Sequence, residues 1–186
     1  MWQKRTRFFR WKTLAVAALL ASVAAGCEGG KPTEPEPISL PDLFGSQLLK
    51  ADGSPVGVNT LGNTTLIGIY VASPGCPACG GFTPILVDSY NQLQDAGRSF
   101  EVVLVSPGIS ESTMLEYMVD SEMPWLALSP QSSQANGLLQ RYDIRWVPTL
   151  IIIDGSGVTI STTGREDLTE NGAAAYETWL ASAGRS

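Results

Sequence analysis

Histidine is absent from this chain of 186 residues, and cysteine occurs only three times. The missing imidazole removes the commonest acid–base group at neutral pH and the commonest metal ligand. A zinc site needs about four Cys or His ligands, and only Cys76 and Cys79 lie beyond the N-terminal segment. We therefore expect no metal and no bound cofactor. Three cysteines are also too few for a disulfide framework, so the core must form by ordinary burial of apolar side chains.

Positive charge is scarce after the first twelve residues. The net charge is −6, yet five basic residues and no acid occur in 1–12, so the remainder of the chain is strongly acidic. Nucleic-acid phosphates would repel such a body, which excludes nucleic acid as a partner. The remainder also shows neither an internal repeat nor a break that would divide it into two domains.

Residues 1–26 have the layout of a signal peptide, with a basic start and a short apolar stretch that is too short to span a bilayer comfortably. The stretch ends in AAGC at 24–27, which resembles the bacterial lipobox, with alanine where that signal usually carries leucine. The resemblance implies cleavage before Cys27 and lipid on its thiol and amine. The alternative is a plain secretory signal that is cut near Ala25 and leaves Cys27 as a free thiol.

Residues 27–37 contain the lipidated Cys27 and then EGGKPTEPEP, which has no apolar side chain to bury. We expect a flexible tether there and a folded domain at 38–186. This layout predicts an extracytoplasmic protein that is lipid-anchored to a bacterial membrane on its periplasmic side.

Apolar runs and helical spacings alternate along 38–186. Continuous apolar runs are typical of strands buried on both faces, and apolar residues three and four apart indicate helices. In chain order we expect a hairpin at 46–60, a strand at 65–72, a helix at 77–96, a strand at 100–106, helices at 111–120 and 134–142, a strand at 149–154, its antiparallel partner at 158–163 and a helix at 173–183. This order predicts an α/β sandwich with helices on both faces of one sheet.

Cys76-Pro77-Ala78-Cys79 follows the strand expected at 65–72 and opens the next helix. Proline is favoured at the first helical position, which puts Cys76 at the N-cap, where N–H groups and the helix dipole favour negative charge. A thiolate is the nucleophile of disulfide exchange. We therefore expect Cys76 to be the attacking thiol and Cys79, one turn later on the same face, to be the resolving thiol.

Three other interpretations of the cysteine pair are weaker. A permanent disulfide over four residues restrains the unfolded chain little, so stability is a poor reason to keep one. A thiol peroxidase has Pro-x-x-x-Thr/Ser-x-x-Cys; Ser73 fits that pattern, but Ile69 stands in place of the proline. A redox-inactive, tethered binding module would tolerate loss of either cysteine, and both are present.

Pro148 enters the strand expected at 149–154, where proline is out of place unless it adopts a special geometry such as a cis bond. The segment Val147-Pro148-Thr149 resembles the thioredoxin superfamily, in which a cis-proline before the third core strand packs against the CxxC. The resemblance implies a three-layer thioredoxin-like sandwich with a central mixed β-sheet. It further implies that the Val147 backbone pairs with the substrate chain and that Pro148 covers the cysteine couple.

Trp146 lies two residues before Pro148, at a position where the relatives often have a small residue. It has two interpretations: it packs in the core, or it forms an apolar wall beside Cys76 that receives a partner's side chain.

A narrower resemblance, over most of 46–166, is to tryparedoxin and nucleoredoxin. It rests on LLKADGSPV, GFTPILVDSYNQL, FEVVLVS, EMPWLALSP, YDIRWVPTLIIID and TGRED, of which the MPWLA at 123–127 is the distinctive part. The resemblance implies a thiol–disulfide oxidoreductase that acts on protein dithiols and disulfides, here as a monomer. It names no electron donor.

The chain departs from this family pattern at three places. Pro74-Gly75 stands where the family has tryptophan before the first cysteine, and Gly80 stands where it has a basic residue after the second. The stretch 66–72 also lacks the buried acid of thioredoxins. Activation of Cys76 is therefore left to its place at the helix start, and no proton acceptor for Cys79 is evident.

Overall fold

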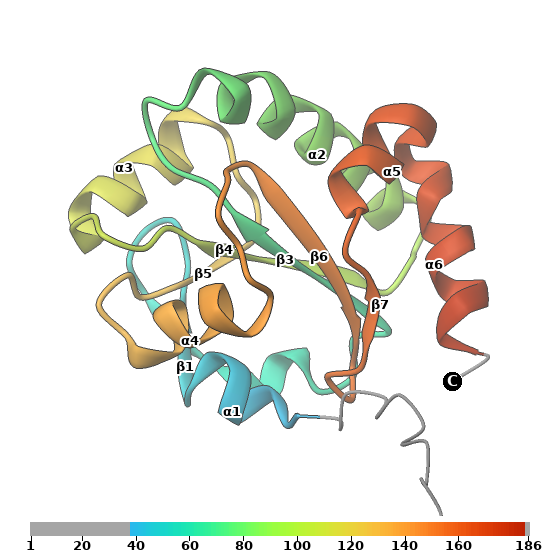
Figure 1. Cartoon of the computed structure of the whole chain (residues 1–186), viewed down its shortest axis with the longest axis horizontal. Helices are drawn as coiled ribbons and strands as arrows, with labels where there is room; N and C mark the ends of the chain where they lie inside the picture. Colours follow the sequence, from blue (N-terminus) through green and yellow to red (C-terminus); the bar gives the residue numbers. More distant parts are fainter. Residues whose placement is uncertain (1–37, 185–186) are drawn as a thin grey trace, which may run out of the picture. The chain divides into compact units, whose positions relative to one another are not determined.

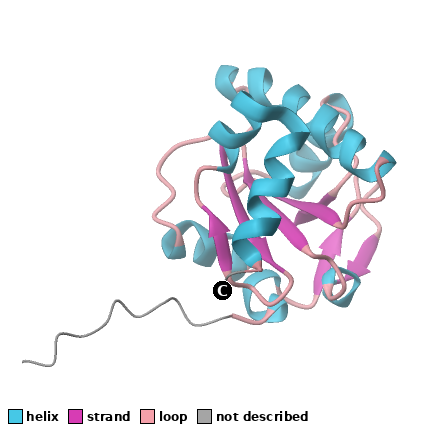
Figure 2. Cartoon of the chain, turned by 90° about the vertical axis from the view of Figure 1, so that its right-hand side faces the viewer, coloured by secondary structure: helices cyan, strands magenta, loops and turns pink. Residues whose placement is uncertain are grey.

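The computed structural model describes residues 38–184, which form a seven-stranded mixed sheet between helices (Figures 1 and 2). The strands are β1 Gln47–Leu49, β2 Pro55–Gly57, β3 Leu66–Val71, β4 Phe100–Val105, β5 Leu126–Leu128, β6 Thr149–Asp154 and β7 Thr159–Ser161. The helices are α1 Leu40–Phe44, α2 Pro77–Asp95, α3 Glu111–Asp120, α4 Ser133–Arg141, α5 Gly164–Asn171 and α6 Ala175–Ala183, with short 3-10 turns at η1 Val58–Leu61 and η2 Gly172–Ala174. The expected mixed α/β sandwich is confirmed.

The sheet order is β2-β1-β5-β4-β3-β6-β7. Strand β3 lies inside the sheet, parallel to β4 and antiparallel to β6, and all six of its residues are buried. Its last residue, Val71, pairs with Thr149, the first residue of β6. This register brings the carboxyl end of β3, which leads to Cys76, next to the amino end of β6, which follows Pro148.

Apolar side chains cover both faces of the sheet. One face packs against α2, α3, α5 and α6 and holds a cluster of aromatic rings that includes Tyr70, Phe100, Trp125 and Trp179. The other face packs against α1, η1 and α4 through aliphatic side chains and Phe44. The alternating side chains of β3 enter both cores, which explains why that strand is a continuous apolar run.

Several elements were not predicted from the sequence. Helix α1 has only five residues and strand β5 only three, which is too short for a periodic signal. Helix α5 buries Leu168 and Gly164 but otherwise carries mostly polar side chains, so it lacks an apolar stripe. The last predicted helix begins as the η2 turn and becomes α-helical at Ala175.

The expected signal peptide at 1–26, and the lipidated Cys27 and flexible tether expected at 27–37, all lie outside the described residues. None of the helices between residues 38 and 184 is long and apolar enough to cross a membrane.

Candidate active site

Cys76 is the N-cap of α2, as predicted from the sequence. Its backbone is extended, with φ −83° and ψ 112°, and Pro77 is the first helical residue. The Cys76 Sγ accepts a hydrogen bond from the Cys79 N–H at 3.2 Å. Gly75 precedes it with φ +75°, a left-handed conformation that glycine adopts at little cost. The turn after β3 therefore aims the Cys76 sulfur at the first free N–H groups of the helix.

The two cysteines of the couple differ in exposure. Cys76 is partly exposed, whereas Cys79 is fully buried in the core beneath α2. Pro77 and Ala78, which separate them, are both exposed. Both cysteines are present as thiols, and only the first of them is accessible to a large partner.

The environments of the two thiols move their pKa values apart. The pKa of Cys76 is lowered, first by a hydrogen bond from the Cys79 thiol and then by the N–H groups of Cys79 and Ala78. The pKa of Cys79 is raised to about 11, first by burial and then by the hydrogen bond to Cys76 and the charge of the Cys76 thiolate, against a lowering effect of the Ser73 N–H. The sequence had indicated that the helix start alone activates Cys76. In the structure the Cys79 thiol also lowers the pKa of Cys76.

The 146–149 loop (Trp146, Val147, Pro148 and Thr149) lies against the couple. The Val147–Pro148 bond is cis, as predicted, and Pro148 is buried. The Val147 carbonyl accepts a hydrogen bond from the Cys76 thiol at 3.7 Å. Val147 is 37% exposed, and its N–H has no hydrogen-bond partner among residues 38–184. The loop therefore presents an unpaired backbone donor next to the accessible sulfur.

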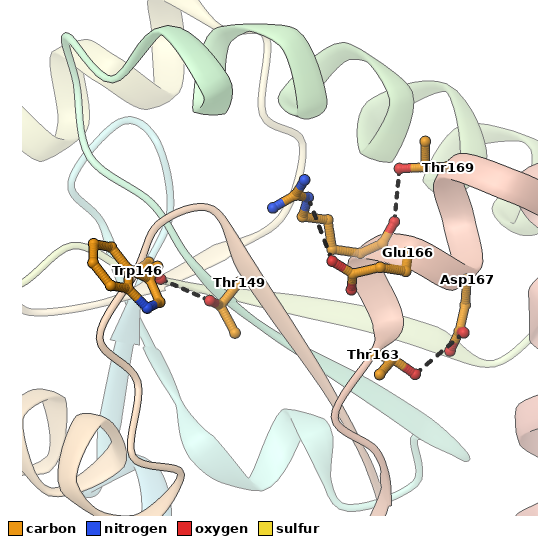
Figure 3. A network of polar contacts seen from close by, with 7 residues as sticks. Trp146, Thr149, Thr163, Glu166, Asp167 and Thr169 are labelled. Atoms are coloured by element: carbon orange, nitrogen blue, oxygen red, sulfur yellow. Dashed lines mark hydrogen bonds and ion pairs between the residues drawn. The ribbon is translucent and has the colours of Figure 1, made fainter.

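Trp146 is 82% exposed, so the interpretation that it packs in the core is wrong. Its backbone carbonyl accepts a hydrogen bond from the Thr149 hydroxyl at 2.7 Å, which closes the loop. In Figure 3 the indole lies on the side of this loop away from Glu166 of α5. A pocket of about 200 Å³ opens beside the loop. Its lining residues are Trp146, Pro148, Thr149, Leu150, Thr162, Arg165 and Glu166.

Sequence reasoning missed a group of hydroxyls below the couple. The Thr83 hydroxyl donates to the Cys79 carbonyl at 2.8 Å, lies 2.7 Å from the buried Tyr70 hydroxyl, and is 3.5 Å from the Tyr117 hydroxyl. Burial raises the pKa of both tyrosines. The spacing of Thr83 four residues after Cys79 was visible in the sequence, but its pairing with Tyr70 of β3 is long-range.

The site offers no evident means of holding a metal. Across residues 38–184 there is no group of three or more His, Cys, Asp or Glu side chains placed to bind an ion. What the arrangement provides is one accessible, acidified thiol, one buried partner thiol and an open backbone edge.

A family model described as thioredoxin-like matches residues 63–159. Tryparedoxin of Trypanosoma brucei brucei is 33% identical over 139 residues, which cover 74% of this chain and 94% of that protein. Nucleoredoxin of Homo sapiens is 33% identical over 138 residues, which cover 74% of this chain but 31% of the relative. The chain thus spans about a third of the length of the mammalian nucleoredoxins it matches.

Solved structures agree with the sequence relatives. Tryparedoxin from Trypanosoma brucei superposes with a TM-score of 0.64 at 33% identity, covering 73% of this chain and 92% of that one. Thioredoxin from Wuchereria bancrofti also gives a TM-score of 0.64, at 32% identity, and covers 75% and 96% of the two chains. The chain belongs to the thioredoxin-like family, as a member similar to tryparedoxin and nucleoredoxin.

Proposed function

We propose that this protein exchanges disulfides with protein partners through Cys76 and Cys79, on the outer side of a bacterial membrane to which lipid on Cys27 anchors it. The observation that carries the redox part is the position of the Cys76 sulfur. It caps α2, has a lowered pKa, and lies 3.7 Å from the carbonyl of Val147, whose N–H is unpaired. A partner's chain can therefore pair with Val147 while its disulfide reaches Cys76.

In the first step, the Cys76 thiolate attacks one sulfur of the partner's disulfide. A new S–S bond forms between Cys76 and that sulfur, the partner's own S–S bond breaks, and its other sulfur leaves as a thiolate that takes a proton from solvent. The mixed disulfide thus joins the two proteins.

In the second step, Cys79 loses its proton and attacks the Cys76 sulfur. The Cys76–Cys79 disulfide forms, and the partner's first sulfur leaves as a thiolate. Two electrons have then passed to the partner. The hydrogen bond to Cys76 and the negative charge of its thiolate both raise the pKa of Cys79. Both disappear once Cys76 is in the mixed disulfide, so the first step itself prepares Cys79 for the second.

The thiol-peroxidase alternative gains no support from the hydroxyl nearest the couple in sequence. The Ser73 hydroxyl donates to the Pro74 carbonyl at 3.4 Å, not to the Cys76 sulfur. A peroxidatic cysteine would need that hydroxyl directed at its own sulfur or at a bound peroxide.

The experiment uses the full chain in detergent, with dithiothreitol as electron donor and two substrates, insulin and bis(2-hydroxyethyl) disulfide. We expect the wild-type chain to accelerate both reductions, and Cys76→Ser or Cys79→Ser to return them to the background rate. Cys79→Ser should accumulate mixed disulfides with insulin because the resolving thiol is missing, and Cys76→Ser should not. Cys27→Ser is the matched control, since it removes the third cysteine and leaves the couple in place.

The opposite trapping pattern would reverse the two roles, and full activity in both serine variants would leave only a binding module. The reduction potential of the couple then gives the direction of transfer. A value near thioredoxin's, about −270 mV, means a reductase, and one near −120 mV means an oxidant.

A further inference from the structure

Trp146 is the most exposed large apolar side chain in the described part of the chain, at 82%. Its backbone is nevertheless held in place, because its carbonyl accepts the Thr149 hydroxyl and Thr149 begins β6. The sheet thus fixes the backbone of Trp146, while its indole is exposed to water and adds nothing to the core. A held backbone that carries an unburied tryptophan is typical of a contact residue for a partner.

Trp146 directly precedes Val147 in the chain, and the Val147 carbonyl accepts a hydrogen bond from the Cys76 thiol. On the helix side of Cys76 the neighbouring positions are small and uncharged. They are Pro74, Gly75, Pro77 and Ala78. Among the residues next in the chain to Cys76 or to Val147, Trp146 therefore carries the large exposed apolar side chain.

Charge contributes little at this place. Arg145, the other neighbour of Trp146, forms an ion pair with Asp143 at 3.0 Å, and both side chains are more than 70% exposed. Arg165, which lines the same pocket as Trp146, lies 3.9 Å from Glu166, again with both side chains exposed. Exposed pairs of this kind contribute little to binding or stability, so the distinctive contact that the loop offers is apolar.

An extended chain that pairs with the Val147 backbone would present the side chain next to its cysteine at the edge of the loop. The indole occupies one side of the loop (Figure 3), and Trp146 is one of the residues that line the pocket of about 200 Å³. We propose that Trp146 is a specificity residue: it packs on a bulky apolar side chain adjacent to the partner's cysteine, so that the site prefers polypeptide disulfides with such a neighbour. This inference rests on the proposed function.

The test uses two short peptides that differ only in the residue before their single cysteine, phenylalanine in one and glycine in the other. Each carries thionitrobenzoate on its cysteine as a mixed disulfide. When the Cys76 thiolate attacks the peptide sulfur, the thionitrobenzoate leaves as a coloured thiolate. Cys79 then releases the peptide thiol by forming the Cys76–Cys79 disulfide, and dithiothreitol reduces that disulfide for the next turnover. The symmetrical dithionitrobenzoate reagent measures the reactivity of the couple without any peptide.

We expect the wild-type full chain to have a kcat/KM about tenfold higher for the phenylalanine peptide, expressed mainly in KM, which is the scale of one apolar contact. Trp146→Ala should lower that ratio to about one and leave the rate with dithionitrobenzoate unchanged. Trp146→Phe should keep most of the preference. Val119→Ala is the matched control, because Val119 is 62% exposed on α3 and is not part of the 146–149 loop, and it should keep the full ratio.

Equal kcat/KM for the two peptides with the wild-type chain would overturn the inference and leave the proposed function standing. A loss of the dithionitrobenzoate rate in Trp146→Ala would also overturn it, since the tryptophan would then act on the couple itself. A wild-type chain that is inert toward all three substrates would instead refute the proposed function.

Discussion

The same one-turn spacing that brings Cys76 and Cys79 together also leaves the first partly exposed with a lowered pKa and the second buried with a raised pKa. Cys76 lies outside the first helical turn, where its sulfur accepts the Cys79 N–H at 3.2 Å. Cys79 lies inside that turn, on the face of α2 that packs on the sheet, and is fully buried. Because charge is favoured at the first position and opposed by burial at the second, a single helix start provides both a nucleophile and a protected resolving thiol.

The difference predicts the pH dependence of alkylation. Iodoacetamide reacts with the thiolate, and the pKa of Cys76 is lowered, so its modification should be half-maximal at a pH below the ordinary thiol value of about 8.5. Cys79, with a pKa raised to about 11, should remain unmodified over the same range. Mass spectrometry of the reduced chain after timed labelling measures both sites.

Cys79→Ala provides the control for this profile. It removes the thiol that donates to Cys76 but keeps both backbone N–H groups. The half-maximal pH of Cys76 should therefore rise without reaching that of an unperturbed thiol. If the pH profile of Cys76 alkylation in Cys79→Ala matched that of the wild type, the whole lowering of the Cys76 pKa would come from the helix start.

At the scale of the element, α2 begins with more glycine than a helix favours. Gly80 and Gly81 are both helical, and a Cβ on either would meet nothing within 4 Å. Gly75, in the turn before the helix, also has open space around a Cβ, but its φ of +75° is left-handed. The three glycines therefore differ in backbone conformation and not in available space.

Substitution by alanine should separate the entropic cost of glycine within the helix from the need for glycine at a left-handed φ. Gly80→Ala and Gly81→Ala should each stabilise the fold by about 0.5–1 kcal/mol, because glycine loses more conformational freedom in a helix. In a chain of this size 1 kcal/mol corresponds to a rise in Tm of roughly 2–4 °C. Gly75→Ala should instead destabilise the fold by about 1–2 kcal/mol, the cost of a left-handed L-residue. Thermal unfolding by circular dichroism tests all three, and a loss of stability in Gly80→Ala would show that the start of α2 needs glycine.

For the whole molecule, the order of segments predicts that it is attached to a membrane. Cys27 ends an apolar stretch with the layout of a signal peptide and precedes EGGKPTEPEP, and the first described helix, α1, begins at Leu40. We expect mass spectrometry of the mature protein to find acylated Cys27 at its N-terminus, and Cys27→Ala to release the chain from the membrane fraction. A mature chain that starts elsewhere and carries no lipid would exclude the anchor.

The features that could be predicted from the sequence are local ones. Pro77 at the first helical position and the apolar spacing of α2 lie within a few residues of Cys76, so they determine its N-cap position before any tertiary contact forms. Strands β3, β4 and β6 are continuous apolar runs because both of their faces are covered. These runs, with the helices between them, were enough for the α/β class and the position of the couple.

The rest depends on contacts between distant parts of the chain. Val147 lies 71 residues from Cys76, and the pairing of Val71 with Thr149 in the folded sheet brings the two together. From the sequence, Trp146 was equally compatible with the core and with the surface. In a helix or strand the spacing of apolar residues shows which of them are buried, but a loop has no such spacing. Helix α5 escaped prediction for a related reason, since its single large buried side chain, Leu168, leaves no stripe to read.

By itself, the sequence determined which cysteine caps the helix and which chemistry the pair supports, because capping and helix phase are set by neighbours a few residues apart. Only the tertiary structure decided what surrounds that pair. The β3–β6 register brings Val147, with its open backbone donor, to the first thiol and leaves the neighbouring Trp146 exposed, and core packing buries the second thiol against the Thr83 and Tyr70 hydroxyls. Register and burial depend on the whole set of long-range contacts, which no short segment of sequence encodes.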